Sequence, residues 1–123
     1  MTTPLEIVNK FFDTWNDKDI EAMAKLLNDD MTYEGPLFTW SGKQEYLEGA
    51  KQILPGFGGM KVIKQYVDGN SVLSIIDITL NTPDGAITFH NADQTEVVNG
   101  KLSKTKTYFD PRKIEKYCVP TQN

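Results

Sequence analysis

The sequence predicts an α+β domain in which a curved antiparallel sheet wraps around a long N-terminal helix. Apolar residues recur at helical spacing early in the chain, and the period changes to two from about residue 60. Asn99-Gly100 then marks a tight hairpin between the last two strands. Helices followed by a meander of long strands are typical of a sheet covered by helices on one face. At 123 residues we expect one domain over residues 1–123.

The first helix is expected to begin at Pro4, a residue type that suits the first helical position. Thr3 can cap this helix, and Glu6 completes a capping box with Thr3. Its apolar residues form one broad stripe of Leu5, Val8, Phe11, Phe12 and Trp15. A second, short helix is predicted from about residue 19 to 27, and Asn28-Asp29-Asp30 are expected to end it.

Three short elements are expected next. Residues 31–34 predict a short strand that Gly35-Pro36 stops, and residues 37–40 predict either a further strand or a buried loop. Ser41 suits the cap of a third helix over roughly residues 43–54, which Pro55 and the following glycines end.

A four-stranded antiparallel meander completes the predicted fold. Strands are expected over residues 60–67, 72–81, 86–98 and 101–109, separated by turns at Asp68-Gly69-Asn70, Pro83-Asp84-Gly85 and Asn99-Gly100. The C-terminal segment predicts a short helix before Pro120.

Composition narrows the possible partners. The 13 basic and 17 acidic residues give a net charge of −4 without a basic stripe, which argues against nucleic acid. A single cysteine and a single histidine cannot build the usual metal sites, and the sequence carries no phosphate-binding glycine loop, so we expect neither metal nor cofactor. No apolar run is long enough to span a membrane and no secretory signal is evident. We therefore expect a cytoplasmic protein with no membrane partner.

Alternation along the last two strands predicts a polar site. One face of residues 86–98 carries Phe89, Asn91, Asp93, Thr95 and Val97, which we place toward the helices. On the last strand we expect the lysine-free set to face the same cavity, namely Ser103, Thr105, Thr107 and Phe109. A carboxyl held in such a cavity loses hydration, which favours its neutral form and suits proton transfer near neutral pH.

Several of these residues have a second interpretation. Asp93 is either a pocket carboxyl or a solvated or structural strand residue. Asp77 either points into the cavity as a second carboxyl or faces outward, because its neighbours are apolar on both sides. His90 has the opposite parity to Asp93, which favours the outer face. Tyr33 either projects its hydroxyl into the cavity mouth or packs its ring, and Phe11 and Trp15 are expected in the core or the pocket wall.

The order of elements and three stretches of sequence resemble a known superfamily. The stretches are residues 8–30, Tyr33-Glu34-Gly35-Pro36, and the segment from Asp93 through Asn99-Gly100 to Tyr108-Phe109-Asp110. They are similar to the nuclear transport factor 2-like superfamily, and most of all to its branch of SnoaL-like polyketide cyclases and ketosteroid isomerases. The resemblance covers nearly the whole chain. It implies a cone-shaped, cystatin-like α+β barrel, but no single activity, because this fold hosts many.

The resemblance transfers only some functional residues. Asp93 falls where the cyclases keep their acid–base aspartate. The proton-shuttling aspartate of the isomerases would fall at Gly35, and their oxyanion tyrosine would fall near Phe11. The last-strand aspartate of the epoxide hydrolases matches Thr107, and no arginine accompanies Asp77.

Two functions follow as hypotheses. The first is a cofactor-free isomerase, lyase or cyclase in which Asp93 moves a proton of a small hydrophobic carbonyl compound. Its substrate would contact Asn91, Tyr33, Thr105, Thr107, Phe109, Phe11, Trp15 and Asp77. The alternative is a non-catalytic domain of the same fold that binds a small ligand or dimerises. Both include a homodimer packed through the sheet face that the helices leave open.

Overall fold

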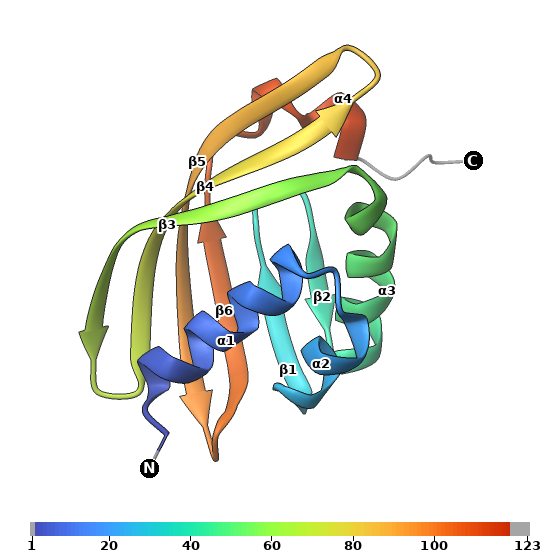
Figure 1. The fold of residues 1–123 in the computed structure, drawn as a ribbon. Coiled ribbons are helices and arrows are strands. Elements are labelled where there is room, and N and C mark those ends of the chain that lie inside the picture. Colours follow the sequence, from blue (N-terminus) through green and yellow to red (C-terminus); the bar gives the residue numbers. More distant parts are fainter. Residues whose placement is uncertain (1, 119–123) are drawn as a thin grey trace.

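A computed structural model describes residues 2–118 and shows six strands and four α-helices in one arrangement (Figure 1). In chain order the elements are α1 (Pro4–Asn16), α2 (Ile20–Lys25), β1 (Leu27–Glu34), β2 (Thr39–Ser41), α3 (Lys43–Ile53), η1 (Leu54–Gly56), β3 (Phe57–Asp68), β4 (Ser71–Thr82), β5 (Gly85–Val98), β6 (Lys101–Tyr108), η2 (Pro111–Lys113) and α4 (Glu115–Cys118). The predicted α+β class is confirmed.

Helix α1 begins as the sequence predicts. The hydroxyl of Thr3 accepts from the backbone N–H of Glu6, and the Glu6 carboxylate accepts from the backbone N–H of Thr3. These two bonds satisfy N–H groups that a helix start would otherwise leave unpaired. The apolar stripe turns toward the sheet, where Val8, Phe11 and Phe12 are buried.

The predicted end of α2 is wrong. Asn28, Asp29 and Asp30 do not terminate the helix but form part of β1, which already starts at Leu27. Leu27 and Met31 are fully buried, whereas the two aspartates face solvent. Pairing with the distant β6 fixes this strand, so the local acidic run could not reveal it.

The start of α3 also differs from the prediction. Ser41 is the last residue of β2, and Gly42 occupies the N-cap with φ 92° and no side-chain hydrogen bond. Instead, the Glu45 carboxylate accepts from the backbone N–H of Ser41 at 2.9 Å. A residue with this positive φ must tolerate the left-handed region, which favours glycine.

The four-strand antiparallel meander is confirmed, and it forms part of a larger sheet. The strand order is β2-β1-β6-β5-β4-β3, in which β1 pairs parallel to β6 and every other pair is antiparallel. The sheet is therefore mixed, which the sequence did not predict. It stays open between β2 and β3, so it does not close into a barrel. Asn99 and Gly100 have φ 55° and 77°, as their hairpin turn requires.

A β-bulge at Ser103 overturns part of the predicted face of β6. Val97 pairs with Leu102 while Glu96 pairs with Lys104, so Ser103 is an extra residue. The bulge reverses the alternation, and Leu102 is buried, although regular alternation with the predicted inward residue Ser103 would turn it outward. Beyond the bulge, Thr105 and Thr107 point inward as predicted.

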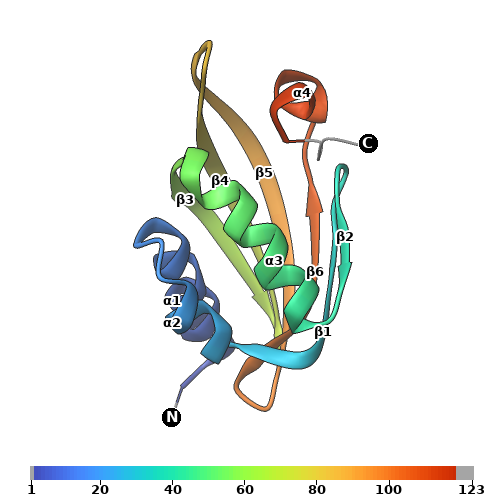
Figure 2. The ribbon, with the colours of Figure 1, turned by 90° about the vertical axis from the view of Figure 1, so that its right-hand side faces the viewer.

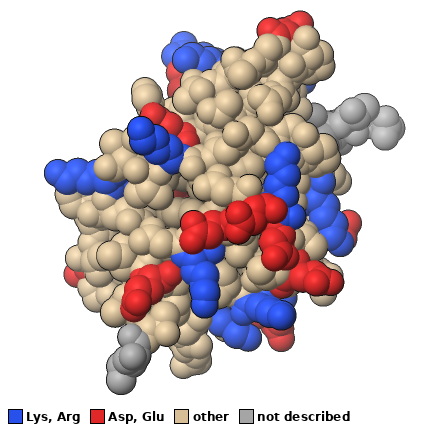
Figure 3. Space-filling view, viewed as in Figure 1, with Lys and Arg blue, Asp and Glu red and all other residues tan. Residues whose placement is uncertain are grey.

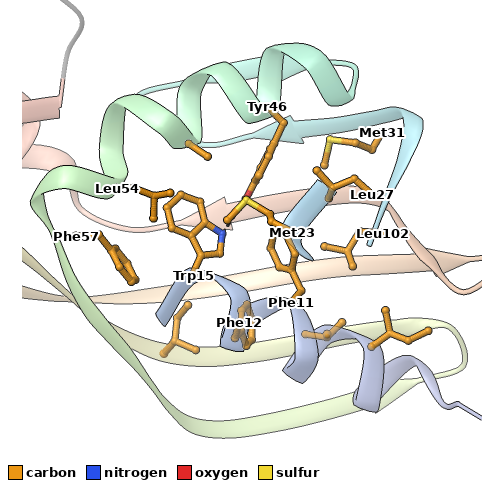
Figure 4. Close-up of a cluster of buried hydrophobic side chains, with 14 of the residues drawn as sticks. Phe11, Phe12, Trp15, Met23, Leu27, Met31, Tyr46, Leu54, Phe57 and Leu102 are labelled. Carbon is orange, nitrogen blue, oxygen red and sulfur yellow. Dashed lines mark hydrogen bonds between the residues drawn. The ribbon is translucent and has the colours of Figure 1, made fainter. Parts of the chain in front are cut away.

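Helix α1 lies across the concave face of the curved sheet, beside α2 and α3 (Figures 1 and 2). Between helices and sheet lies the hydrophobic core, in which Trp15 of α1 and Tyr46 of α3 come together (Figure 4). The Trp15 indole N–H donates to the Tyr46 hydroxyl at 3.2 Å. On the helix-bearing face, acidic and basic side chains are intermixed (Figure 3).

The C-terminal elements η2 and α4 lie at the wide end of the cone, near the β4–β5 hairpin (Figure 2). The Tyr117 hydroxyl donates to the Asp84 carboxylate in that hairpin at 2.5 Å, and Lys116 approaches the same carboxylate at 3.7 Å. Ile114 is buried in the core. These contacts hold the C-terminal segment over the open end of the sheet.

Candidate functional site

A cavity of about 100 Å³ lies between α1, α3 and the concave face of the sheet. Its walls are mainly aromatic and aliphatic, and polar groups lie among them on Tyr33, Tyr46, Asn91, Asp93 and Thr107. An apolar pocket with a few converging polar groups is the usual form of a small-molecule site.

Asp93 is the acidic residue of the cavity wall, and it is 6% exposed. Burial raises the pKa of its carboxyl to about 6, because the charged form loses hydration. Its Oδ1 accepts from the Thr95 hydroxyl at 2.7 Å, which acts in the opposite direction and lowers the pKa. Within residues 2–118, Asp93 forms no ion pair. Desolvation therefore dominates its behaviour.

Tyr33 and Thr107 form a second polar pair in the wall. Their hydroxyls lie 2.9 Å apart, and Thr107 is the cross-strand neighbour of Asp93. Burial and the nearby Asp93 carboxylate raise the pKa of Tyr33 to about 12, so the phenol keeps its proton at neutral pH. Gly35 makes room for this pair, because a Cβ there would lie 2.6 Å from the Thr107 hydroxyl oxygen.

Asn91 lines the cavity on the same strand face as Asp93. Its side chain is 5% exposed, and its amide oxygen is buried without a hydrogen-bond partner among the described residues. Buried amide oxygens are rarely left in this state.

The remaining sequence-predicted contact residues divide into two groups. Phe11, Trp15 and Phe109 line the cavity. Thr105 does not, because it lies two residues closer to the β5–β6 turn, where its hydroxyl is 3.0 Å from that of Thr95. Its hydroxyl contacts the Thr95 hydroxyl, which bonds to Asp93, and it does not face the cavity.

The inward alternative for Asp77 is wrong. Its carboxylate lies 2.6 Å from Nδ1 of His90, its cross-strand neighbour, and His90 is exposed. Ile76 and Ile78 take the inward positions on β4 and line the cavity instead. The sequence could not decide the direction of the Asp77 side chain, because both of its neighbours are apolar. The predicted outward direction of His90 is confirmed.

A second hollow of about 710 Å³ adjoins the cavity at the wide end of the cone. We call it the outer cleft; it lies between α3, the β4–β5 hairpin and α4. Cavity and cleft share five wall residues, Phe38, Trp40, Ile53, Leu80 and Cys118. The Trp40 ring stacks on Tyr33 at 4.9 Å and on Phe38 at 5.1 Å, so an aromatic stack runs from the cavity into the cleft.

Sequence reasoning did not assign a role in the site to Thr95 or Tyr46. The Thr95 hydroxyl donates to the Asp93 carboxyl, and Tyr46 lines the cavity beside Trp15. Thr95 shares the strand face of Asp93, which was a usable signal. Trp40, expected in the core or the pocket wall, lines both the cavity and the cleft, and it packs so closely on α3 that a Cβ at Gly49 would come within 2.1 Å of its ring.

Residues 2–118 contain no cluster of three or more metal-ligating side chains. Among the same residues, no helix is both long and apolar enough to cross a membrane.

An open curved sheet with a helix across its concave face is the fold of nuclear transport factor 2-like proteins. The chain matches the model of the SnoaL-like domain over residues 8–105, and it belongs to this family. No curated protein matches it.

Solved structures support the same class. An NTF2-like protein of unknown function from Cytophaga hutchinsonii is 26% identical with a TM-score of 0.83, covering 93% of this chain and 96% of that one. A proposed ketosteroid isomerase from Kribbella flavida is 26% identical with a TM-score of 0.76, covering 87% and 77%. An LEH-like epoxide hydrolase from M. tuberculosis shares the fold at 21% identity and a TM-score of 0.81, covering 94% and 88%.

Proposed function

We propose that this protein is a cofactor-free isomerase, lyase or cyclase that moves a proton of a small, hydrophobic, enolisable carbonyl compound. The proposal depends on one observation, the carboxyl of Asp93 in an aromatic-lined cavity. Burial raises the pKa of this carboxyl to about 6. A group with this pKa exchanges protons readily near neutral pH, as general acid–base catalysis requires.

In the proposed mechanism the Asp93 carboxylate takes a proton from the carbon next to the substrate carbonyl. At pH 7 about nine-tenths of a group with this pKa is ionised, so the basic form prevails. The electron pair of the broken C–H bond moves onto the carbonyl oxygen, where the protonated Tyr33 hydroxyl donates a hydrogen bond to the developing charge. Asp93 then returns the proton to another carbon or to a leaving oxygen.

The cavity limits what can reach Asp93. A dry cavity of about 150 Å³ holds one benzene ring, so about 100 Å³ accepts a fragment smaller than a ring. A fused ring system does not fit beside Asp93 in this arrangement. We propose that a short acyl-like end of the substrate enters the cavity and that any larger part occupies the outer cleft.

A second candidate function is small-ligand binding without catalysis. It is favoured by Gly35 and Phe11, which replace two functional residues of the similar isomerases. Under this candidate, Asp93 and the aromatic walls bind the ligand and perform no proton transfer.

We also propose a homodimer packed through the outer face of the sheet. Tyr66 and Tyr108 are 51% and 55% exposed there, and strand pairing places Leu73, Ile75 and Ala92 beside them. An isologous pairing of this face would cover these apolar side chains.

Replacement of Asp93 by Asn tests the catalytic proposal. The substitution keeps the shape of the side chain but removes the transferable proton. We expect proton exchange at the α-carbon of an enolisable substrate, followed by ¹H NMR in D₂O, to slow by roughly 10²–10⁴-fold. In the parent protein, kcat/KM should rise with pH through about 6, because the basic form of Asp93 is required.

Asp77→Asn provides the matched control, since it makes the same change on the outer face of the neighbouring strand. Its exchange rate should equal that of the parent. Equal rates in the parent and Asp93→Asn would refute catalysis by Asp93 and support the binding candidate.

A further inference from the structure

The proposed chemistry leaves the unpartnered amide oxygen of Asn91, a residue of the cavity wall, without a role. The Asn91 side chain is 5% exposed, and within the described residues its Oδ1 is the buried side-chain atom that lacks a hydrogen bond. An acceptor that loses its water without gaining a donor destabilises the folded protein. Such an atom calls for an explanation, and a ligand that supplies the donor is one.

None of the other polar side chains of the cavity forms a hydrogen bond with this oxygen. The Tyr33 and Thr107 hydroxyls are bonded to each other at 2.9 Å, and the Asp93 carboxylate accepts from Thr95 at 2.7 Å. On the side of Asn91 away from Asp93 the strand continues to Phe89, whose ring packs against Phe109 at 5.2 Å. The amide oxygen of this wall residue is therefore buried with no hydrogen-bond donor for it among the described residues.

Asn91 and Asp93 are two residues apart on one strand, so their Cα atoms are separated by about 7 Å. A ligand that reaches Asp93 with one polar group can reach Asn91 with a second group a few bonds away. A ketone, which has no donor, would leave the amide oxygen unpaired, whereas an alcohol or an N–H group would satisfy it. A site built around a buried polar group rejects an analogue that lacks the matching group.

We propose that Asn91 is a specificity-determining residue, and that the site selects ligands whose buried end carries a hydroxyl or N–H donor for its amide oxygen. The inference rests on the proposed function only in requiring that the cavity binds a small molecule. It does not depend on proton transfer by Asp93. Together with the proposed chemistry, it points to hydroxy- or amino-substituted carbonyl compounds.

Two small probes test this directly. 2-Butanol and 2-butanone have the same carbon skeleton and differ in whether the oxygen carries a hydrogen. We expect two-dimensional ¹H–¹⁵N NMR titrations of the parent at pH 7 to give a dissociation constant about tenfold lower for 2-butanol. In Asn91→Leu, which keeps the branched shape and removes the amide, this preference should disappear.

Further measurements separate the possible outcomes. Gln94→Leu makes the same kind of change on the exposed face of β5 and should keep the parent preference. The Asn91 side-chain amide signals of the parent should shift with 2-butanol, which provides a test that needs no Leu variant.

Because these titrations measure binding alone, a failure of the catalytic proposal leaves their outcome unchanged. Equal affinity of the parent for both probes, no binding of either probe, or a preference that survives in Asn91→Leu would overturn the proposal.

Discussion

Asp93 owes its raised pKa to one cause, the loss of water around its carboxyl group. The Thr95 hydroxyl opposes this effect and does not cancel it. A desolvated carboxyl without a cationic partner costs free energy when it ionises, so ionisation of Asp93 lowers the stability of the folded protein.

This cost predicts a pH-dependent difference in stability between the parent and Asp93→Asn. Burial raises the Asp93 pKa from 3.8 to about 6, so between these values the folded protein binds more protons than the unfolded chain. The contribution of the neutral carboxyl is fully present below about pH 4 and is lost as pH rises through 6. Asn does not ionise, and we expect the variant to gain on the order of 3 kcal/mol relative to the parent between pH 4 and pH 8.

Urea titrations of both proteins across this pH range measure the difference. Asp13→Asn, an exposed substitution on α1, subtracts the effect of losing one charge. A stability difference that stays constant, or that favours the parent at high pH, would show that Asp93 is solvated or stabilised in its charged form.

Single residues were predicted from the sequence where strand alternation was regular. Parity placed Asp93, Asn91 and Thr107 inward and His90 outward, as the structure has them. Parity could not decide Asp77, because both of its sequence neighbours are apolar and the outward residues Leu73 and Ile75 of the same strand are apolar too.

At the scale of elements, local signals predicted the parts that local interactions fix. The capping box of α1 and the Asn99-Gly100 turn each involve residues close in the chain. The start of β1 depends on pairing with β6, which is far away in sequence, and it was missed. The same holds for the parallel pairing of β1 with β6. The bulge at Ser103 was also missed although it lies close to the Asn99-Gly100 turn, because the prediction assumed regular alternation along β6.

The β5–β6 turn gives a testable consequence for stability. Gly100 has φ 77°, a conformation that a β-branched residue adopts only with strain. A Cβ there would find its nearest contact, Ile7, at 4.0 Å, so backbone strain and not crowding sets the cost. We expect Gly100→Val to lower the free energy of unfolding by about 1–3 kcal/mol in a chemical denaturation series.

Lys101→Val is the matched control, because it introduces the same side chain at the first, exposed residue of β6. It should unfold within about 0.5 kcal/mol of the parent. Denaturation curves of Gly100→Val that superimpose on those of the parent would contradict the role assigned to the turn.

At the scale of the whole molecule, the two faces of the sheet have different roles. The concave face holds α1, the core and the cavity, while the outer face presents Tyr66 and Tyr108 to solvent. The family was predictable because the order of helices and strands spans nearly the whole chain. The size of the cavity was not, since it depends on how Trp40 and the C-terminal segment close the cone.

The outer face predicts association. Sedimentation at micromolar concentration should give twice the 13.9 kDa mass of one chain. Ile75→Glu places a charge among the apolar residues of this face and should yield monomers. Lys10→Glu, exposed on α1, should leave the dimer intact. A parent that sediments at 13.9 kDa would contradict the proposed homodimer.

The proposed acid–base role of the site depends on the pKa of the Asp93 carboxyl, which an NMR titration measures directly. In protein labelled with ¹³C at the aspartate carboxyl carbons, the signal absent from Asp93→Asn identifies the residue. We expect its chemical shift to titrate with a midpoint near pH 6. A midpoint at or below 3.8, the ordinary aspartate value, would show a carboxyl that is hydrated or stabilised in its charged form, and would contradict the proposed acid–base role.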